Sequence, residues 1–139
     1  DKDTGEIEIQ KFVAVEDCGN VINPMVVEGQ ILGGIVQGVG QALYEHGVYD
    51  DDGQLVSGSM LDYTMPRADN FPMIESDRIE TPSPSNTLGV KGVGEMGSIT
   101  SPPAVVNAVV DALSDYGVKH IDMPLTSEKI WNLIQTNGG

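Results

Sequence analysis

Positive charge is scarce in this sequence of 139 residues. Seven Lys and Arg residues stand against 21 Asp and Glu residues, which gives a formal net charge of −14. Proteins that bind nucleic acids use clustered Lys and Arg to neutralise phosphates, and polybasic membrane anchors use the same side chains. The composition therefore excludes nucleic acid and a charged membrane surface as partners.

Cysteine and long apolar runs are scarce as well. Cys18 is the sole cysteine, so neither an intramolecular disulfide nor a cysteine cluster for zinc or iron–sulfur can form within the chain. This usage fits a reducing compartment, and we expect a cytoplasmic protein. Gln30, Gln37 and Gln41 interrupt the most apolar region, which excludes the run of roughly 18 apolar residues that a membrane helix needs.

The length is that of one domain. Gly and Pro together occupy 25 of the 139 positions, which is below the level of about 25–30% that indicates low complexity. We therefore expect a single folded domain over residues 1–139. Because the sequence starts at Asp1 without an initiator Met, we expect either a fragment of a longer polypeptide or a small subunit of an assembly.

Alternating apolar residues predict several strands. In residues 6–17 the apolar residues are Ile7 and Ile9 and then Phe12, Val13 and Val15, a period-two pattern with one local slip that predicts a strand with one face buried. A short hairpin around an Asp-Gly turn is expected near residue 53. The predicted strands are 6–17, 48–49 with 55–56, 73–80 and 118–123.

Three helices are predicted from apolar spacing and from capping residues. The first spans residues 25–46, with Gly47 at its C-terminal cap. The second starts at Ser101-Pro102-Pro103, because Ser offers a capping oxygen and proline loses no hydrogen bond in a first turn, and it ends at Gly117. The third is capped by Thr126. Mixed strands with three helices predict the α+β fold class.

The most informative segment is a glycine-rich loop. Residues 89–98 read GVKGVGEMGS, with four glycines and one carboxylate, Glu95. Residues 92–97 spell G-x-G-x-x-G, the fingerprint of dinucleotide-binding folds, but that fingerprint follows a buried strand and runs directly into a helix. Here the preceding residues 81–88 are rich in Ser and Pro, and the predicted helix starts only at Ser101. A nicotinamide-binding domain is therefore the weakest of the functional interpretations. On composition alone, a carboxylate such as Glu95 is more often a solvated surface group than a catalytic base.

A family resemblance resolves this choice. The stretch GVKGVGEMGSITSPPAVVNAVVDAL at 89–113 resembles the C-terminal signature of the molybdenum hydroxylase large subunits, the xanthine dehydrogenase and aldehyde oxidase family, and is most similar to the aerobic carbon-monoxide-dehydrogenase type. Further similar segments are VEDCGNVINP at 15–24, VEGQ at 27–30, GIVQGVGQ at 34–41 and IDMPLTSEK at 121–129. The match spans nearly the whole chain in the family's order, and it implies the C-terminal part of a molybdopterin-binding domain.

The resemblance also implies roles for individual residues. Glu95 matches the family's catalytic base in an oxidation that transfers water-derived oxygen to a substrate carbon. Gln30 matches a glutamine that contacts the cofactor, and Gly92, Val93 and Gly94 match backbone close to the metal centre. No residue of the chain is expected to ligate the metal directly.

The implied cofactor is molybdopterin with Mo, in its cytosine dinucleotide form, and the implied substrate is a small molecule. Iron–sulfur clusters and FAD belong to partner subunits or domains, so the expected partners are the remainder of the large subunit and the iron–sulfur and flavin subunits. The isolated chain is expected to be inactive. A separately encoded or non-catalytic subunit that retains the fold, acting as an interaction module, stays open as an alternative.

Overall fold

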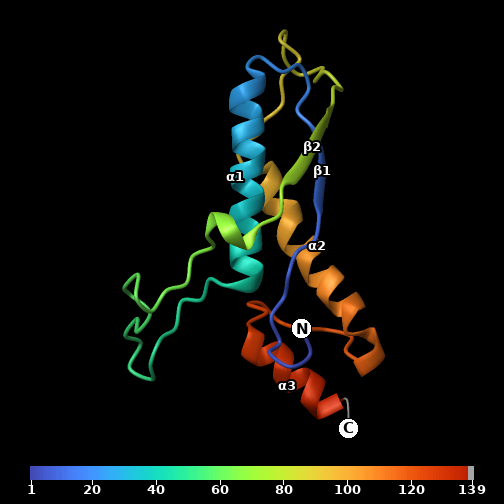
Figure 1. Cartoon of the computed structure of the whole chain (residues 1–139). Helices are drawn as coiled ribbons and strands as arrows, with labels where there is room; N and C mark the ends of the chain where they lie inside the picture. Colours follow the sequence, from blue (N-terminus) through green and yellow to red (C-terminus); the bar gives the residue numbers. More distant parts are fainter. Residues whose placement is uncertain (138–139) are drawn as a thin grey trace.

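The computed structural model of the chain, in which residues 1–137 are described, has three helices and one two-stranded sheet (Figure 1). This is the mixed α+β class that the sequence predicts. Among the described residues, no helix is both long and apolar enough to cross a membrane. The elements in chain order are β1 (Phe12–Asp17), α1 (Pro24–Leu43), the 3-10 turn η1 (Ala68–Asn70), β2 (Ile74–Ile79), α2 (Met96–Ala112), the 3-10 turn η2 (Ser114–Tyr116) and α3 (Ser127–Asn137).

The two long helices pack with their backbones in close contact. A Cβ atom added to Gly34 of α1 would lie 3.0 Å from the backbone N of Ser98, and one added to Gly97 of α2 would lie 2.3 Å from the carbonyl O of Ile31. A Cβ at Gly38 would lie 2.0 Å from Oγ of Ser101. Glycine costs a helix up to about 1 kcal/mol against Ala, and close packing explains its presence at these three positions.

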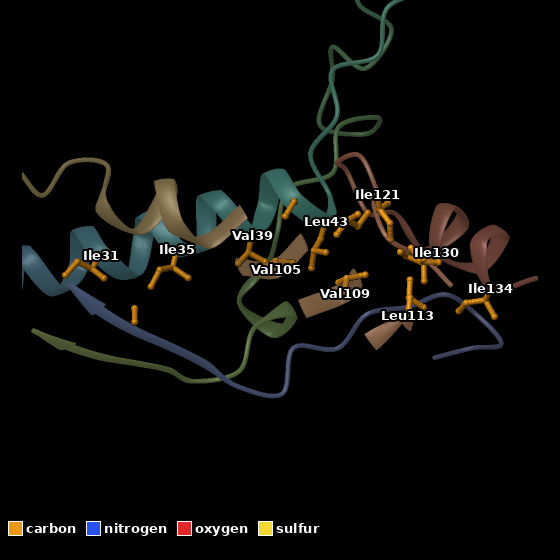
Figure 2. Close-up of a cluster of buried hydrophobic side chains, with 14 of the residues drawn as sticks. Ile31, Ile35, Val39, Leu43, Val105, Val109, Leu113, Ile121, Ile130 and Ile134 are labelled. Atoms are coloured by element: carbon orange, nitrogen blue, oxygen red, sulfur yellow. The ribbon is translucent and has the colours of Figure 1, made fainter. Parts of the chain in front are cut away.

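The hydrophobic core runs along this helix pair and continues to α3. Figure 2 shows aliphatic side chains of α1, of α2 and the residue after it, and of α3 meeting in one cluster. The segment before β1 also reaches α3, because a Cβ at Gly5 would lie 2.0 Å from the carbonyl O of Ser127. The buried aliphatic residues labelled in Figure 2 are Ile31, Ile35, Val39, Leu43, Val105, Val109, Leu113, Ile121, Ile130 and Ile134.

The sheet is small and open on one side. β1 and β2 are parallel, with a register that runs from Phe12 opposite Ile74 to Asp17 opposite Ile79. Ala14 is buried, whereas Val13 and Val15 on the other face of β1 are each 55% exposed. β1 begins later than predicted, because β2 offers only six residues for pairing, so residues 6–11 lie outside the sheet.

Residues 44–67 form an arm that extends away from the helices (Figure 1). The predicted hairpin lies within it, since Tyr49 and Leu55 form an antiparallel bridge. The Tyr63 hydroxyl donates to the Glu45 carboxylate and thereby joins the two limbs of the arm near its base.

Two predicted helix ends are wrong. The first helix ends at Leu43 rather than His46, because the backbone N–H groups of Tyr44 and Glu45 both donate to the Gly40 carbonyl, at 2.9 and 2.8 Å, and Gly47 caps nothing. The second helix begins at Met96, so Ser101-Pro102-Pro103 lies inside it.

The reason for the earlier start of α2 is its contact with α1. Gly97 packs against the α1 backbone, and Ser101 uses its hydroxyl to donate to the Gly97 carbonyl at 2.7 Å instead of capping. Tertiary packing thus offsets the hydrogen bonds that Pro102 and Pro103 cannot donate. The α-helix ends at Ala112, and Gly117 caps the 3-10 turn η2 that follows.

The predicted strand at 118–123 is also wrong. Its apolar residues Val118 and Ile121 are buried in the core, but the described residues offer it no strand to pair with, since the sheet consists of β1 and β2. The backbone N–H of Leu125 instead donates to the carbonyl of Ala42 at 2.7 Å, which fixes the segment to the end of α1. The third helix is confirmed, with Thr126 Oγ1 accepting from the backbone N–H of Lys129 at 3.4 Å.

The helix contact leads to a stability prediction for adjacent glycines of α1. Gly34→Val is expected to lower the free energy of unfolding by about 1–3 kcal/mol, the usual cost of overpacking. Gly33→Val is the matched control, because a Cβ at Gly33 would meet no atom within 4 Å and the helix propensities of Val and Gly differ by roughly 0.5 kcal/mol. Denaturant melts of both variants measure the difference, and equal stabilities would contradict the contact.

Candidate functional site

The structure brings together two segments that the sequence singles out. Gln30, on the exposed side of α1, donates from Nε2 to the carbonyl O of Gly94 at 2.8 Å. Gly92, Gly94 and Glu95 are exposed, and the Val93 side chain packs partly buried against the core. The predicted cofactor residues thus lie at one place, although Val93 can offer a ligand only its backbone.

The glycine-rich segment is fixed at its start by the chain that follows β1. Asn20 donates from its backbone N–H to the Gly89 carbonyl at 3.0 Å and from Nδ2 to the Leu88 carbonyl at 2.7 Å. The Lys91 backbone N–H donates to the Cys18 carbonyl at 3.1 Å. These bonds require a tight approach, because a Cβ at Gly19, whose φ is +61°, would lie 2.3 Å from the Gly89 carbonyl O.

The Asp17 carboxylate is the electrostatic centre of this region. Its Oδ2 accepts from Lys91 Nζ at 2.6 Å, and its Oδ1 accepts from the backbone N–H groups of Gly19 and Thr81 at 3.0 and 3.1 Å. The bond to Lys91, followed by those two backbone donors, holds the pKa of the Asp17 carboxyl well below its usual range. The group therefore stays ionised across the physiological pH range.

Glu95 lies at the junction between the glycine segment and α2. It is the residue before the first turn of the helix, and its side chain makes no capping hydrogen bond. Within residues 1–137, the backbone N–H groups of residues 92–95 donate to no protein acceptor. One carboxylate therefore adjoins a row of four free donors, an arrangement that can bind oxygen atoms of a ligand and exchange a proton beside them.

Cys18 serves packing. It is buried, and its thiol contacts the Met96 sulfur at 3.7 Å. Burial raises the pKa of the Cys18 thiol, which keeps it protonated and a poor nucleophile at neutral pH.

In the part of the chain that the structure describes, no three His, Cys, Asp or Glu residues form a group that could hold a metal ion. His46 is exposed in the arm, and His120 pairs with Asp122 at 2.9 Å on an exposed turn.

The dinucleotide fingerprint requires a correction. Because α2 begins at Met96, residues 92–97 do run into a helix, contrary to the prediction. The other half of the argument holds: residues 81–88 contain no strand, so the glycines do not follow the buried strand that a nicotinamide-binding turn requires.

Two residues of the site have no role in the predictions, namely Asp17 and Lys91. Both belong to segments singled out for other residues. The sequence does contain a feature that singles out Lys91: it is the one Lys or Arg of residues 81–100, in a chain that has seven such residues. Which carboxylate it meets is set by the fold, because Asp17 is 74 positions away.

Comparison with known proteins gives consistent matches. Residues 1–72 match the molybdopterin cofactor-binding domain family. The chain is 50% identical over 127 residues to the large subunit of nicotine 6-hydroxylase from Paenarthrobacter nicotinovorans, covering 91% of the chain and 16% of that protein. It is 42% identical over 135 residues to the carbon monoxide dehydrogenase large chain of Hydrogenophaga pseudoflava, covering 97% and 17%.

Solved structures give the same picture. The fold superposes on reconstituted carbon monoxide dehydrogenase from Oligotropha carboxidovorans with a TM-score of 0.94 at 37% identity, covering 99% of this chain and 17% of that one. The chain therefore spans about a sixth of the length of the relatives it matches.

The lowered pKa of Asp17 leads to a prediction for the pH dependence of stability. A carboxyl with a depressed folded-state pKa adds stability above its unfolded pKa of about 4, and this contribution is lost as pH falls toward the folded value. Asp17→Asn should therefore lower the free energy of unfolding at pH 7, and the gap to wild type should shrink below about pH 4. Denaturant melts between pH 7 and pH 3 measure the gap, with Glu75→Gln in the exposed Lys11–Glu75 pair as control. A gap that stays constant over this range would contradict the assignment.

Proposed function

Since the chain belongs to the molybdopterin cofactor-binding domains of the molybdenum hydroxylase large subunits, we propose that it supplies the catalytic base, Glu95, and part of the cofactor site of an enzyme that oxidises a substrate carbon with water-derived oxygen. The observation that carries this proposal is the contact between Gln30 and Gly94. It brings the α1 segment and the glycine segment, 64 positions apart, to one exposed surface beside Glu95.

The residues present fit a bound pterin cofactor. A Cβ at Gly29, Gly33, Gly92 or Gly94 would meet no atom within 4 Å, so these glycines lack the packing reason that explains Gly34. Each helical glycine costs up to about 1 kcal/mol, and close approach of a ligand to the backbone is a reason to keep it. Gln30 and the free N–H groups of residues 92–95 would hold the cofactor, which supplies the redox centre that accepts two electrons from the substrate.

The chain's own residues have distinct tasks in this mechanism. Glu95 accepts the proton that is released when the oxygen nucleophile attacks the substrate carbon, and its side chain is free to do so because no hydrogen bond occupies it as a cap. Gln30 keeps its carbonyl oxygen available toward the cofactor while its amide N–H holds Gly94. The donors of residues 92–94 orient oxygen atoms next to Glu95.

The wider assembly follows from the same proposal. Residues 1–139 form one unit that joins the remainder of the large subunit, and iron–sulfur and flavin subunits carry electrons onward. The cofactor is the cytosine dinucleotide form, and the location is cytoplasmic. The location rests on the cysteine usage, and the other statements rest on the family resemblance, which also implies a small-molecule substrate.

The first test concerns the chain alone. Because most of the relatives' length lies outside it, the purified chain is expected to hold no molybdenum and to reduce no dye. Metal analysis and dye reduction with nicotine, quinoline, xanthine, carbon monoxide and an aromatic aldehyde provide the measurement, and the assembled enzyme should oxidise at least one of them. Stoichiometric molybdenum with turnover in the isolated chain would refute the expectation that residues outside this chain complete the cofactor site.

The second test concerns Glu95 in the assembled enzyme. Glu95→Gln keeps size and hydrogen-bonding reach but cannot accept a proton at neutral pH, so kcat should fall by about 10²–10⁴-fold at unchanged molybdenum content. Glu128→Gln is the matched control, since Glu128 is an exposed carboxylate in the first turn of α3. Turnover of Glu95→Gln within about threefold of wild type, far above the range expected for a lost base, would show that Glu95 is a surface carboxylate.

A further inference from the structure

The segment that carries Glu95 is held at two points. At one end, Gln30 Nε2 holds the Gly94 carbonyl at 2.8 Å. At the other, Lys91 is bound twice, by its backbone N–H to the Cys18 carbonyl at 3.1 Å and by Nζ to Asp17 Oδ2 at 2.6 Å. Between these points lie Gly92 and Val93, and the first of them has nothing within 4 Å of a built Cβ.

Such a segment would be mobile without its anchors. Glycine loses more backbone freedom on ordering than any other residue, and ordering one residue costs about 1–2 kcal/mol. Gly92 and Gly94 have no side chains that could supply this ordering, so it falls to the anchors and to Val93, whose side chain packs against the core between them.

The Asp17 carboxylate is suited to act as such an anchor. It joins three separate segments, because its oxygens accept from Lys91, from the backbone of Gly19 and from the backbone of Thr81, just beyond β2. The Asp17 and Lys91 side chains are 34% and 33% exposed, against about 60% for each member of the Lys11–Glu75 pair. Partial burial weakens screening by water and salt, so this pair should hold its partners more firmly than an exposed pair.

Building on the proposed role of Glu95, we propose that the Asp17–Lys91 ion pair is a positioning device for the catalytic carboxylate. It fixes the start of the glycine segment against the end of β1, and Gln30 fixes its end, so Glu95 enters α2 in one place. A displacement of about 1 Å at a reacting group can cost as much as 10²-fold in rate. Loss of the pair therefore lowers kcat through Glu95, while the cofactor stays bound, because Gln30 lies on α1 and not on the segment that the pair positions.

The experiment uses the assembled enzyme with four variants. Lys91→Met and Asp17→Asn each remove one charge of the pair, and Lys91→Arg keeps both charges. Lys11→Met, which breaks the exposed Lys11–Glu75 pair, is the control. The readouts are kcat and KM for the panel compound with the highest turnover, molybdenum content, and amide hydrogen exchange of peptides covering residues 89–98.

The proposal requires a specific pattern. Lys91→Met and Asp17→Asn should lower kcat by about 10–100-fold with KM and molybdenum content near wild type, and the double variant should be no slower than the slower single variant, since both remove one interaction. Lys91→Arg should recover most of kcat. The backbone N–H groups of residues 91 and 96 donate to the Cys18 and Val93 carbonyls at 3.1 and 3.3 Å. Their exchange should rise in Lys91→Met and stay unchanged in Lys11→Met.

The opposite outcomes overturn it. Wild-type kcat or unchanged exchange in Lys91→Met means that the pair does not hold the segment, and a parallel loss of molybdenum means that it serves cofactor retention instead. Glu95→Gln, assayed alongside, separates the two proposals. If Glu95→Gln is inactive while Lys91→Met is fully active, the positioning role of the Asp17–Lys91 pair is wrong but Glu95 remains the base. If Glu95→Gln is active, Glu95 is not the base, and both proposals are wrong.

Discussion

The direct contact of two helix backbones is the constraint on which the rest of this chain depends. Gly34 and Gly97 allow α1 and α2 to approach more closely than any side chain would permit. The contact places the N-terminal end of α2 beside the middle of α1, and therefore places Glu95 beside the exposed side of α1. A larger residue at the crossing would push the two helices apart, and this would lengthen the 2.8 Å hydrogen bond from Gln30 to the Gly94 carbonyl.

A second layer of order comes from polar groups at the edge of that contact. The end of β1 contributes carbonyl, amide and carboxylate groups to the glycine segment, through Cys18, Asn20 and Asp17. The contact between α1 and α2 thus fixes the residue at which α2 begins. The end of β1 fixes the position of the glycine segment that leads into α2. This strongly acidic chain has few cations, so the position of each one matters. Lys91 neutralises the Asp17 carboxylate, which also accepts hydrogen bonds from the backbone of Gly19 and Thr81.

The sequence predicts most of the elements and the membership of the site, and it fails where tertiary contacts override local chemistry. Local periodicity is enough for α1 and for α3, because each buries one face with regular spacing. β2 is predicted as well, although Ile74 is half-buried and its other five residues are exposed. Ser101-Pro102-Pro103 has the chemistry of a helix start, but packing of Gly97 on α1 extends the helix one turn before it. Gln30 and Glu95 could be named from motif resemblance, whereas the pairing of Asp17 with Lys91 depends on a fold that local patterns do not encode.

The hydrogen bond between Tyr63 and Glu45 determines where the arm can tolerate a change of length. Because it joins the limbs of the arm near the base, the polypeptide beyond it is a loop whose ends are already fixed. Doubling the length of such a loop costs only about 0.6 kcal/mol in closure entropy. Insertions at the tip, around residues 51–61, can therefore add new surface to the molecule without disturbing the contact between Gln30 of α1 and Gly94, beside Glu95.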